Sequence, residues 1–457
     1  MSKSVTDRLA EYVFEAKFNE MPRDVIEKAK ELILDDVGNA LGGFPIRGSK
    51  ILLKWARTLS CKPESTIIGD GSKTLSCIAA GLNSYMAWAT DFMETYRNLG
   101  HPGSNIVQTA LSLGEREGIS GKDVLTAVIV AYEVTSRIIN ATIPTPKFRR
   151  RVWNMSWHVI GSVVAASKIL ELNVAEIENA FGIGIGNAPT YNLHKLLYVP
   201  ASMAKGANFI HCFIGIISAE LAKMGFTGHH DILDGDYGYW STISDVNREE
   251  EYTKGLGKEY NLLKYVSFKP WSTCRWAQPG VESLLKIMKE NNLTVNDVEK
   301  VVYCAHEKVT SFPYNNTDPK TPEDAYWSVP WAFANAALGY PPGPSWYSDE
   351  RFEDKRLKEF MKKVELRTYR PAVTAFSKDP QKSVTLLIVK TKEKTYKERT
   401  EYCKGDPQRP MTRDELVSKF KSQASQVIDS EKVEENVRII EWIEDLDNVK
   451  ELFDLLY

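Results

Sequence analysis

Three residues that could hold or move a proton lie close together in the segment ATDFMETYRNLGHPGSNIVQTAL, namely Asp91, Thr95 and His101. An imidazole changes its charge near neutral pH and a neighbouring carboxylate can orient it, so this pair is typical of general acid–base catalysis. We expect Asp91 near the end of a buried helix, with Thr95 four residues on and on the same helix face. A polar loop follows, and the next helix starts after His101-Pro102-Gly103. The alternative is that Asp91 and Thr95 only satisfy helix ends and that His101 is a turn residue.

Several basic residues stand where they could bind an anion. Lys205, in SMAKGAN, precedes a long apolar helix, and its charge adds to the positive end of the helix dipole, which opposes stability and favours anion binding. SFKPWSTCRWAQPGVESLL places Lys269, Arg275 and Gln278 within ten residues at the expected junction of two domains, where ligands often bind. The competing interpretation is that Lys269 and Arg275 are solvated surface charges. His158 opens the apolar helix SWHVIGSVVAASKI, where a core histidine bonded to a backbone carbonyl is the commoner outcome.

The bulk properties exclude several classes of protein. The chain of 457 residues carries 58 basic and 60 acidic side chains, a formal net charge of -2, so no long-range field favours nucleic acid or an anionic membrane. We find no apolar run of transmembrane length and no signal-peptide core near the N-terminus. The six cysteines form no CxxC pair, and His211, His229 and His230 lack metal-ligand spacing. With no Rossmann fingerprint or P-loop either, we expect a cytoplasmic protein without a metal or cofactor.

Hydrophobic periodicity predicts helices through the first half of the chain. Apolar residues recur three and four positions apart in 22–43, 74–94, 121–139, 156–172 and 207–225. Short β-branched or alternating runs follow, in VEKVVYCAHEKV, KKVELRTY, QKSVTLLIVKTK and KTYKERTEY. The end of the chain returns to helix behind a Thr-x-x-Glu capping box at Thr412 and Glu415. We therefore predict a mainly α fold, in which a large all-helical domain formed by both chain ends (1–265 and 403–457) carries an inserted smaller α+β lid domain (266–402).

Taken together, these segments resemble the MmgE/PrpD family, which includes 2-methylcitrate dehydratase, cis-aconitate decarboxylase and iminodisuccinate epimerase. The resemblance covers nearly the whole chain and rests on DDVGNALGG, the block from Asp91 to His101, SWHVIG, SMAKG, GFTG, FKPWSTCRWAQ, and WSVPWAFANAAL followed by KKVEL. It implies the helical domain with its lid, a homodimer, and an active site between the two domains. The residues that match the family's site are Asp91, Thr95, His101, His158, Lys205 and Lys269.

Two departures from the family pattern bear on the reaction. Met93 and Glu94 stand where the family often has aspartates. Gln278 stands where some members, the decarboxylase among them, have histidine, although others have glutamine. With both changes we still expect the site to bind carboxylates, but the type of reaction stays open.

The chemistry that these residues suggest is proton abstraction beside a carboxylate. A small di- or tricarboxylate would be held, and an enediolate-like transition state stabilised, by the basic side chains of Lys205, Lys269, His158 and Arg275. His101, oriented by Asp91, would move the proton, and Thr95 or a water would protonate a leaving hydroxyl. Catalysis is thus assigned to His101, Asp91, Thr95 and Lys205, and substrate binding to His158, Lys269, Arg275 and Gln278.

Three reactions fit the same residues. We expect foremost a 2-methylcitrate dehydratase-like hydro-lyase, because Lys205-Gly206 and Gln278 resemble that branch of the family. The alternatives are a cis-aconitate decarboxylase-like carboxy-lyase and an iminodisuccinate epimerase-like isomerase. A noncatalytic paralogue that only binds carboxylates is a further alternative, against which the presence of both Asp91 and His101 counts.

Overall fold

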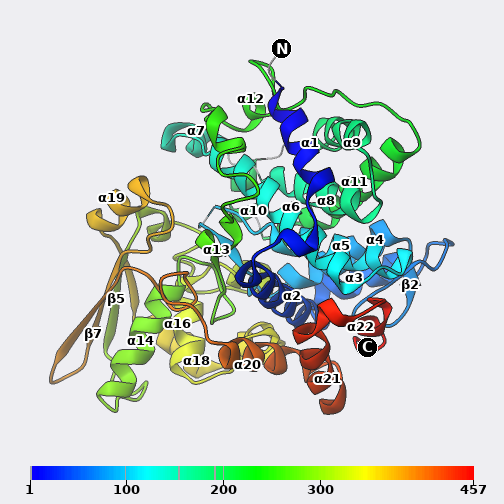
Figure 1. The fold of residues 1–457 in the computed structure, drawn as a ribbon. Helices are drawn as coiled ribbons and strands as arrows, with labels where there is room; N and C mark the ends of the chain where they lie inside the picture. Colours follow the sequence, from blue (N-terminus) through cyan, green and yellow to red (C-terminus); the bar gives the residue numbers. More distant parts are fainter. Residues whose placement is uncertain (1–2, 98, 153–154, 190–191, 199) are drawn as a thin grey trace.

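The structure is a computed structural model that describes residues 3–97, 99–152, 155–189, 192–198 and 200–457. Helices dominate, and the first half of the chain builds the helical body on the right of Figure 1. Its helices are α1 (Val5–Glu15), α2 (Arg23–Gly43), α3 (Arg47–Ala56), α4 (Ser76–Trp88), α5 (Gly103–Glu117), α6 (Gly121–Ala141), α7 (Pro146–Arg151), α8 (Trp157–Ile169), α9 (Val174–Gly186), α10 (Leu193–Tyr198), α11 (Met203–Lys223), α12 (Trp240–Ile243) and α13 (Asn261–Tyr265). The helices predicted from periodicity are therefore present.

Helices α4, α5, α8 and α11 pack closely around one another and form the interior of this body. Small residues allow the close approach: a Cβ added to Gly215 of α11 would lie 2.3 Å from the Cβ of Ser162 on α8. Helix α6 lies against α8 and is long and apolar enough to cross a membrane, but the whole of its apolar window is buried inside the protein. Its composition is that of a core helix.

A four-stranded sheet forms on the opposite side, at the left of Figure 1. Its strands are β5 (Lys300–Ala305), β6 (Val364–Thr368), β7 (Thr385–Lys390) and β8 (Thr395–Thr400), in the order β6-β5-β7-β8. The β5–β6 pair is parallel and the other two pairs are antiparallel. All four strands were predicted from their alternating or β-branched runs. The helices of this part are α14 (Gln278–Glu290), α15 (Pro322–Ala325), α16 (Val329–Ala337), α17 (Asp349–Glu353), α18 (Lys355–Met361) and α19 (Arg370–Lys378).

The end of the chain returns to the helical body as α20 (Arg413–Ala424), α21 (Ser430–Glu441) and α22 (Lys450–Phe453). Thr412 and Glu415 form the predicted capping box at the start of α20. Helix α20 lies along α2, where a Cβ added to Gly38 would lie 2.9 Å from the ring of Phe420. One hydrophobic core accordingly joins side chains from Val5 to Phe268 with side chains from Leu416 to Leu456. A second core unites side chains between Cys274 and Val389 with Ile46, Tyr85 and Ala89.

The helical part is not entirely helical, contrary to the prediction. A hairpin of β1 (Ser65–Thr66) and β2 (Lys73–Thr74) lies within it, and β3 (Thr95–Tyr96) pairs antiparallel with β4 (Val266–Ser267). The pairing of Thr95 with Ser267 brings the segment after α4 beside the segment that leads to Lys269. Two parts of the chain that are far apart in sequence thus meet at one point.

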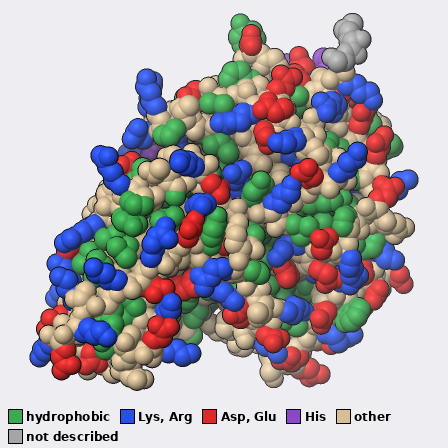
Figure 2. Space-filling view, turned by 60° about the vertical axis from the view of Figure 1, so that its left-hand side comes forward, with side chains coloured by type: hydrophobic (Ala, Val, Ile, Leu, Met, Phe, Trp, Pro, Cys, Tyr) green, Lys and Arg blue, Asp and Glu red, His purple; other side chains and the backbone are tan. Residues whose placement is uncertain are grey.

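Charged side chains of both signs are interspersed over the face shown in Figure 2, and no large area of that face carries a single sign. This distribution agrees with the near-zero net charge. Recognition of an anion must therefore be local.

Candidate active site

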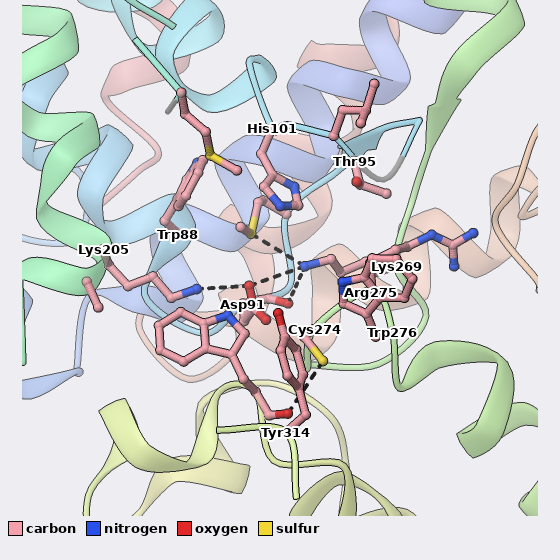
Figure 3. Close-up of a pocket in the computed structure, with 15 residues that line it drawn as sticks. Trp88, Asp91, Thr95, His101, Lys205, Lys269, Cys274, Arg275, Trp276 and Tyr314 are labelled. Atoms are coloured by element: carbon pink, nitrogen blue, oxygen red, sulfur yellow. Dashed lines mark hydrogen bonds and ion pairs between the residues drawn. The ribbon is translucent and has the colours of Figure 1, made fainter. Parts of the chain in front are cut away.

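A cavity of about 70 Å³ lies where the segment after α4, the start of α11 and the segment before α14 converge, and it has room for a few water molecules. Figure 3 shows its walls. Of the side chains proposed from sequence, it is lined by Asp91, Thr95, His101, Lys205, Lys269 and Arg275. The remaining wall consists of Trp88, Met93, Leu99, Met155, Ala204, Cys274, Trp276, Tyr314 and Trp327.

Two lysines converge on the carboxylate of Asp91. Lys205 Nζ donates to Asp91 Oδ1 at 2.9 Å, and Lys269 Nζ lies 3.3 Å from the same oxygen and 2.9 Å from the Asp91 carbonyl oxygen. Figure 3 shows the two amino groups approaching Asp91 from opposite sides. Burial alone would raise the pKa of the Asp91 carboxyl, but the charges of Lys205 and Lys269 hold it below its usual value. Asp91 is therefore ionised and bridges two cations.

The position of Asp91 differs from the prediction. Helix α4 ends at Trp88, and Asp91 takes a left-handed backbone conformation with φ of 52°, which is rare outside glycine and clusters at functional sites. Thr95 lies in β3, so Asp91 and Thr95 do not share a helix face. The prediction failed because the apolar period of the helix continues past the point where the backbone turns out of it.

Lys205 is the third residue of α11 and is almost completely buried. Its Nζ lies 4.8 Å from the ring centre of Tyr326, 5.1 Å from that of Trp327 and 5.7 Å from that of Trp88. Burial lowers the pKa of the Lys205 ammonium, whereas Asp91 opposes this shift. Aromatic faces attract a cation and a helix start attracts an anion, so this corner can hold an ammonium and a carboxylate together.

His101 lines the same cavity as the two lysines, and a hydrogen bond fixes the orientation of its ring. Its Nδ1 is 2.5 Å from the backbone oxygen of Glu94, and because a carbonyl can only accept, Nδ1 carries the proton and Nε2 the lone pair. Burial lowers the pKa of His101 to about 3, and the charge of Lys269 acts in the same direction. The site thus presents a neutral imidazole whose Nε2 carries the lone pair. Glu94, rather than the expected Asp91, provides the hydrogen bond that orients it.

The Glu94 side chain supports the same loop. Its Oε1 accepts the backbone N–H of Gly103 at 2.7 Å, the first residue of α5. Burial raises the pKa of Glu94 to about 8, and the nearby carboxylates of Asp36 and Asp35 add to that shift. Thr95 also serves the loop, since its hydroxyl donates to the Gly100 carbonyl at 3.4 Å. The segment that carries His101 is therefore held from several directions.

Three of the proposed substrate-binding residues are engaged elsewhere. His158 is fully buried behind the cavity wall, where its Nε2 accepts the backbone N–H of His101 at 3.3 Å. Arg275 lines the cavity, but its guanidinium points away from the centre and pairs with Asp406 and Cys403. Gln278 is buried and bonds the backbone of residues 271 and 273, which shapes the segment after Lys269. These three side chains therefore support the site from behind.

Sequence reasoning missed most of the apolar wall. Trp88 stands three residues before Asp91, and Cys274 and Trp276 flank Arg275. Their nearness in sequence to proposed site residues could have indicated that they line the cavity. Tyr314 and Trp327 come from distant segments and carried no such signal. Burial raises the pKa of the Tyr314 hydroxyl well above its usual value, so it is a neutral donor.

Comparison with known proteins identifies the family of this chain. A family model for the MmgE/PrpD N-terminal domain matches residues 7–251, and one for the C-terminal domain matches residues 271–445. The chain belongs to the MmgE/PrpD family. This confirms the resemblance seen in the sequence.

Curated relatives in this family include cis-aconitate decarboxylases. The mouse protein is 26% identical to this chain, and the match covers 100% of the chain and 94% of the relative. The human protein is 24% identical, with 100% and 95% covered. The cis-aconitate decarboxylase of Aspergillus terreus (strain NIH 2624 / FGSC A1156) is 27% identical over 62% of this chain and 60% of its own length. Decarboxylases are lyases, and this MmgE/PrpD chain is an enzyme of that class.

Proposed function

We propose that this enzyme is a carboxy-lyase that needs no cofactor and acts on a small polycarboxylate, with cis-aconitate as the first substrate to test. The observation that carries the proposal is the approach of Lys205 and Lys269 to one carboxylate oxygen, at 2.9 and 3.3 Å, in a cavity shared with a neutral His101. The hydro-lyase reaction expected foremost from sequence becomes the second candidate, because the relatives matched along the whole chain are named decarboxylases.

The two lysines would hold the substrate carboxylates that remain in the product. When the carbon–carbon bond to the departing carboxylate breaks, its electron pair moves onto carbon and into the conjugated carboxylate system. Lys205 and Lys269 stabilise the charge that develops there, because ammonium groups in a buried site interact strongly with an enediolate-like anion. Asp91 pairs with both ammonium groups and holds them close together until the substrate arrives.

His101 would supply the proton that completes the reaction. Burial and the charge of Lys269 lower the pKa of His101 to about 3. A bound polyanion counteracts both the burial penalty and the lysine charge, so it raises this pKa and lets Nε2 take up a proton. Transfer of that proton to carbon yields carbon dioxide and an unsaturated acid with one carbon fewer, so atoms and charge balance.

The apolar wall favours decarboxylation over dehydration. Trp88, Trp276 and Trp327 surround the cavity, and a carboxylate that faces such rings loses hydration which neutral carbon dioxide does not need. Dehydration instead requires an acid beside the departing hydroxyl, and the hydroxyl of Thr95, the side chain expected from sequence to fill this role, already donates to a backbone carbonyl. The apolar wall therefore suits decarboxylation, in which a charged carboxylate becomes neutral carbon dioxide, better than dehydration.

Proton NMR in deuterated water tests the proposal. The purified enzyme is incubated separately with cis-aconitate, with 2-methylcitrate and with an amino-dicarboxylate. We expect cis-aconitate to yield carbon dioxide and the shortened acid with deuterium at one carbon. Alkene formation from 2-methylcitrate without loss of carbon dioxide would indicate the hydro-lyase, and deuterium in an unchanged skeleton would indicate the isomerase.

Three variants assign the roles. Lys205→Met should abolish binding and turnover, whereas Lys289→Met, an exposed lysine at the end of α14, should leave both unchanged. His101→Gln should bind the substrate and fail to convert it. If no substrate reacts while one binds and Lys205→Met prevents that binding, the chain is a noncatalytic carboxylate-binding protein and the proposal is wrong.

A further inference from the structure

A row of polar side chains runs from the back of the active site into the helical core. It consists of His158 on α8 and of Asn208 and His211 on α11, all fully buried. Within the described part of the chain, the side-chain atoms left without a hydrogen-bond partner there are His158 Nδ1, Asn208 Nδ2 and Oδ1, and His211 Nδ1 and Nε2. Buried polar atoms are nearly always hydrogen bonded, so a cluster of unpaired ones requires an explanation.

The unpaired atoms are complementary. His158 Nε2 accepts the backbone N–H of His101 at 3.3 Å and therefore carries a lone pair, which places the proton of neutral His158 on Nδ1. Asn208 offers an unpaired acceptor in Oδ1 and lies close to His158, although without the geometry of a direct hydrogen bond. Its Nδ2 is an unpaired donor, and His211, three residues along the same helix, offers unpaired ring nitrogens.

The backbone that carries His101 rests on this row. A Cβ added to Gly100 would lie 3.4 Å from His158 Nε2 and 3.1 Å from the indole nitrogen of Trp157, so the peptide before His101 is in contact with both rings. The His158 and His211 rings lie edge to face with centres 5.5 Å apart. The side-chain amide of Asn105, on α5, donates to the backbone carbonyl of Asn208 at 3.0 Å. This bond joins α11 to α5, the helix that begins just after His101.

We propose that Asn208 and His211 are positioning residues, which hold His158 in its Nδ1–H form and through it fix the backbone of His101. The chain of hydrogen bonds runs from His101 N–H to His158 Nε2, from His158 Nδ1–H to Asn208 Oδ1, and from Asn208 Nδ2–H to His211. Its last two links join atoms that have no other hydrogen-bond partner among the described residues, and we expect substrate binding to shorten them, as is common for hydrogen bonds at catalytic sites. The catalytic consequence rests on the proposed role of His101, whereas the hydrogen-bond chain itself does not.

Nitrogen-15 NMR of ring-labelled histidine tests the hydrogen-bond chain directly, because the protein contains only seven histidines and each His→Gln variant removes the two ring signals of one residue for assignment. We expect His158 as the Nδ1–H tautomer, and its Nδ1–H proton should exchange more slowly with water when a dicarboxylate such as succinate is bound. A proton on Nε2 of His158 in the wild-type protein overturns the proposal without any mutation. Since this measurement needs no turnover, it fails independently of the decarboxylase proposal.

Variants then test the role in catalysis. Asn208→Leu should lower kcat by about 10- to 100-fold, the usual loss when a supporting partner is removed, with KM changed less than about threefold. The same variant should leave His158 as a mixture of tautomers. His211→Gln keeps a hydrogen-bonding group and should retain more activity than His211→Phe. If Asn208→Leu does not fold, Asn208→Ser is measured in the same way.

A matched control separates positioning from general stability. Asn436 on α21 is also fully buried with an unpaired Oδ1, but it lies far from the site and bonds the backbone of Lys432 and Leu455. Asn436→Leu should lower thermal stability and leave kcat and the His158 tautomer unchanged. The proposal is wrong if Asn436→Leu lowers kcat as much as Asn208→Leu, or if Asn208→Leu leaves both kcat and the tautomer unaltered.

Discussion

Replacing Asp91 by asparagine removes one negative charge from between two buried ammonium groups and hardly changes the shape of the side chain. At an effective dielectric constant of about 20, the distances of 2.9 and 3.3 Å correspond to about 5–6 kcal/mol of attraction for each ion pair. Much of this is offset by the cost of burying the carboxylate. The net loss for a broken buried pair is about 3–5 kcal/mol, because the partner cations stay behind uncompensated.

For a chain of 457 residues that unfolds in one transition, each kcal/mol shifts Tm by about 1 °C, so Asp91→Asn should lower the Tm of the ligand-free protein by about 3–5 °C. Calorimetry measures the change in Tm, and urea unfolding measures the change in the free energy of unfolding. The control is Glu434→Gln, which removes an exposed ion pair with Lys421 and should cost less than about 1 kcal/mol.

Addition of succinate makes the test sharper. A dicarboxylate can replace the missing charge, so it should stabilise Asp91→Asn more than the wild type at the same concentration. The reasoning is refuted if Asp91→Asn is as stable as Glu434→Gln, or if succinate raises both Tm values equally. Either result would mean that Lys205 and Lys269 are not held together by charge.

Further predictions concern pH and assembly. The pKa of Glu94 is raised to about 8, so the stability of the wild-type protein should fall by about 1.4 kcal/mol per pH unit as pH rises from about 4.5 to 8. Glu94→Gln should flatten this slope, which urea unfolding at pH 6 and 8 measures. An unchanged slope would contradict the prediction. His101 and His211 have pKa values lowered to about 3, so each should cost about 1 kcal/mol of stability when pH falls from 6.5 to 5.5. His211→Gln should remove one such contribution, and equal losses in variant and wild type would exclude it. Light scattering should give about twice the chain mass of 51.7 kDa if the homodimer expected from the family forms, and a monomer mass would reject it.

The sequence was informative about elements and less so about side-chain directions. Helices α2, α6, α8 and α11 and all four strands of the sheet follow from apolar periodicity, because burial on one face selects one residue type at regular intervals. The division into domains 1–265 with 403–457 and 266–402 stays a prediction, as does a cytoplasmic location. The main local error lies after α4, where Asp91 leaves the helix although the apolar pattern continues.

The contacts that complete the site were not readable from sequence for a physical reason. Arg275 pairs with Asp406, and β3 pairs with β4, across more than a hundred residues of chain. Such contacts depend on how helices pack, which a local pattern does not specify. His158 shows the same limit: its position in a helix was predicted, whereas the backbone atom that it holds became visible only in three dimensions.

The left-handed turn at Asp91 means that the resting enzyme already holds a carboxylate of its own between its two lysines. Any incoming acid competes with this internal anion and must bring more negative charge than it displaces. A monocarboxylate merely exchanges one charge for another and gains little, whereas a di- or tricarboxylate gains with each additional group. If the proposed function holds, selectivity for polyacids would follow from a charge threshold set by one aspartate, before the shape of the substrate has any effect.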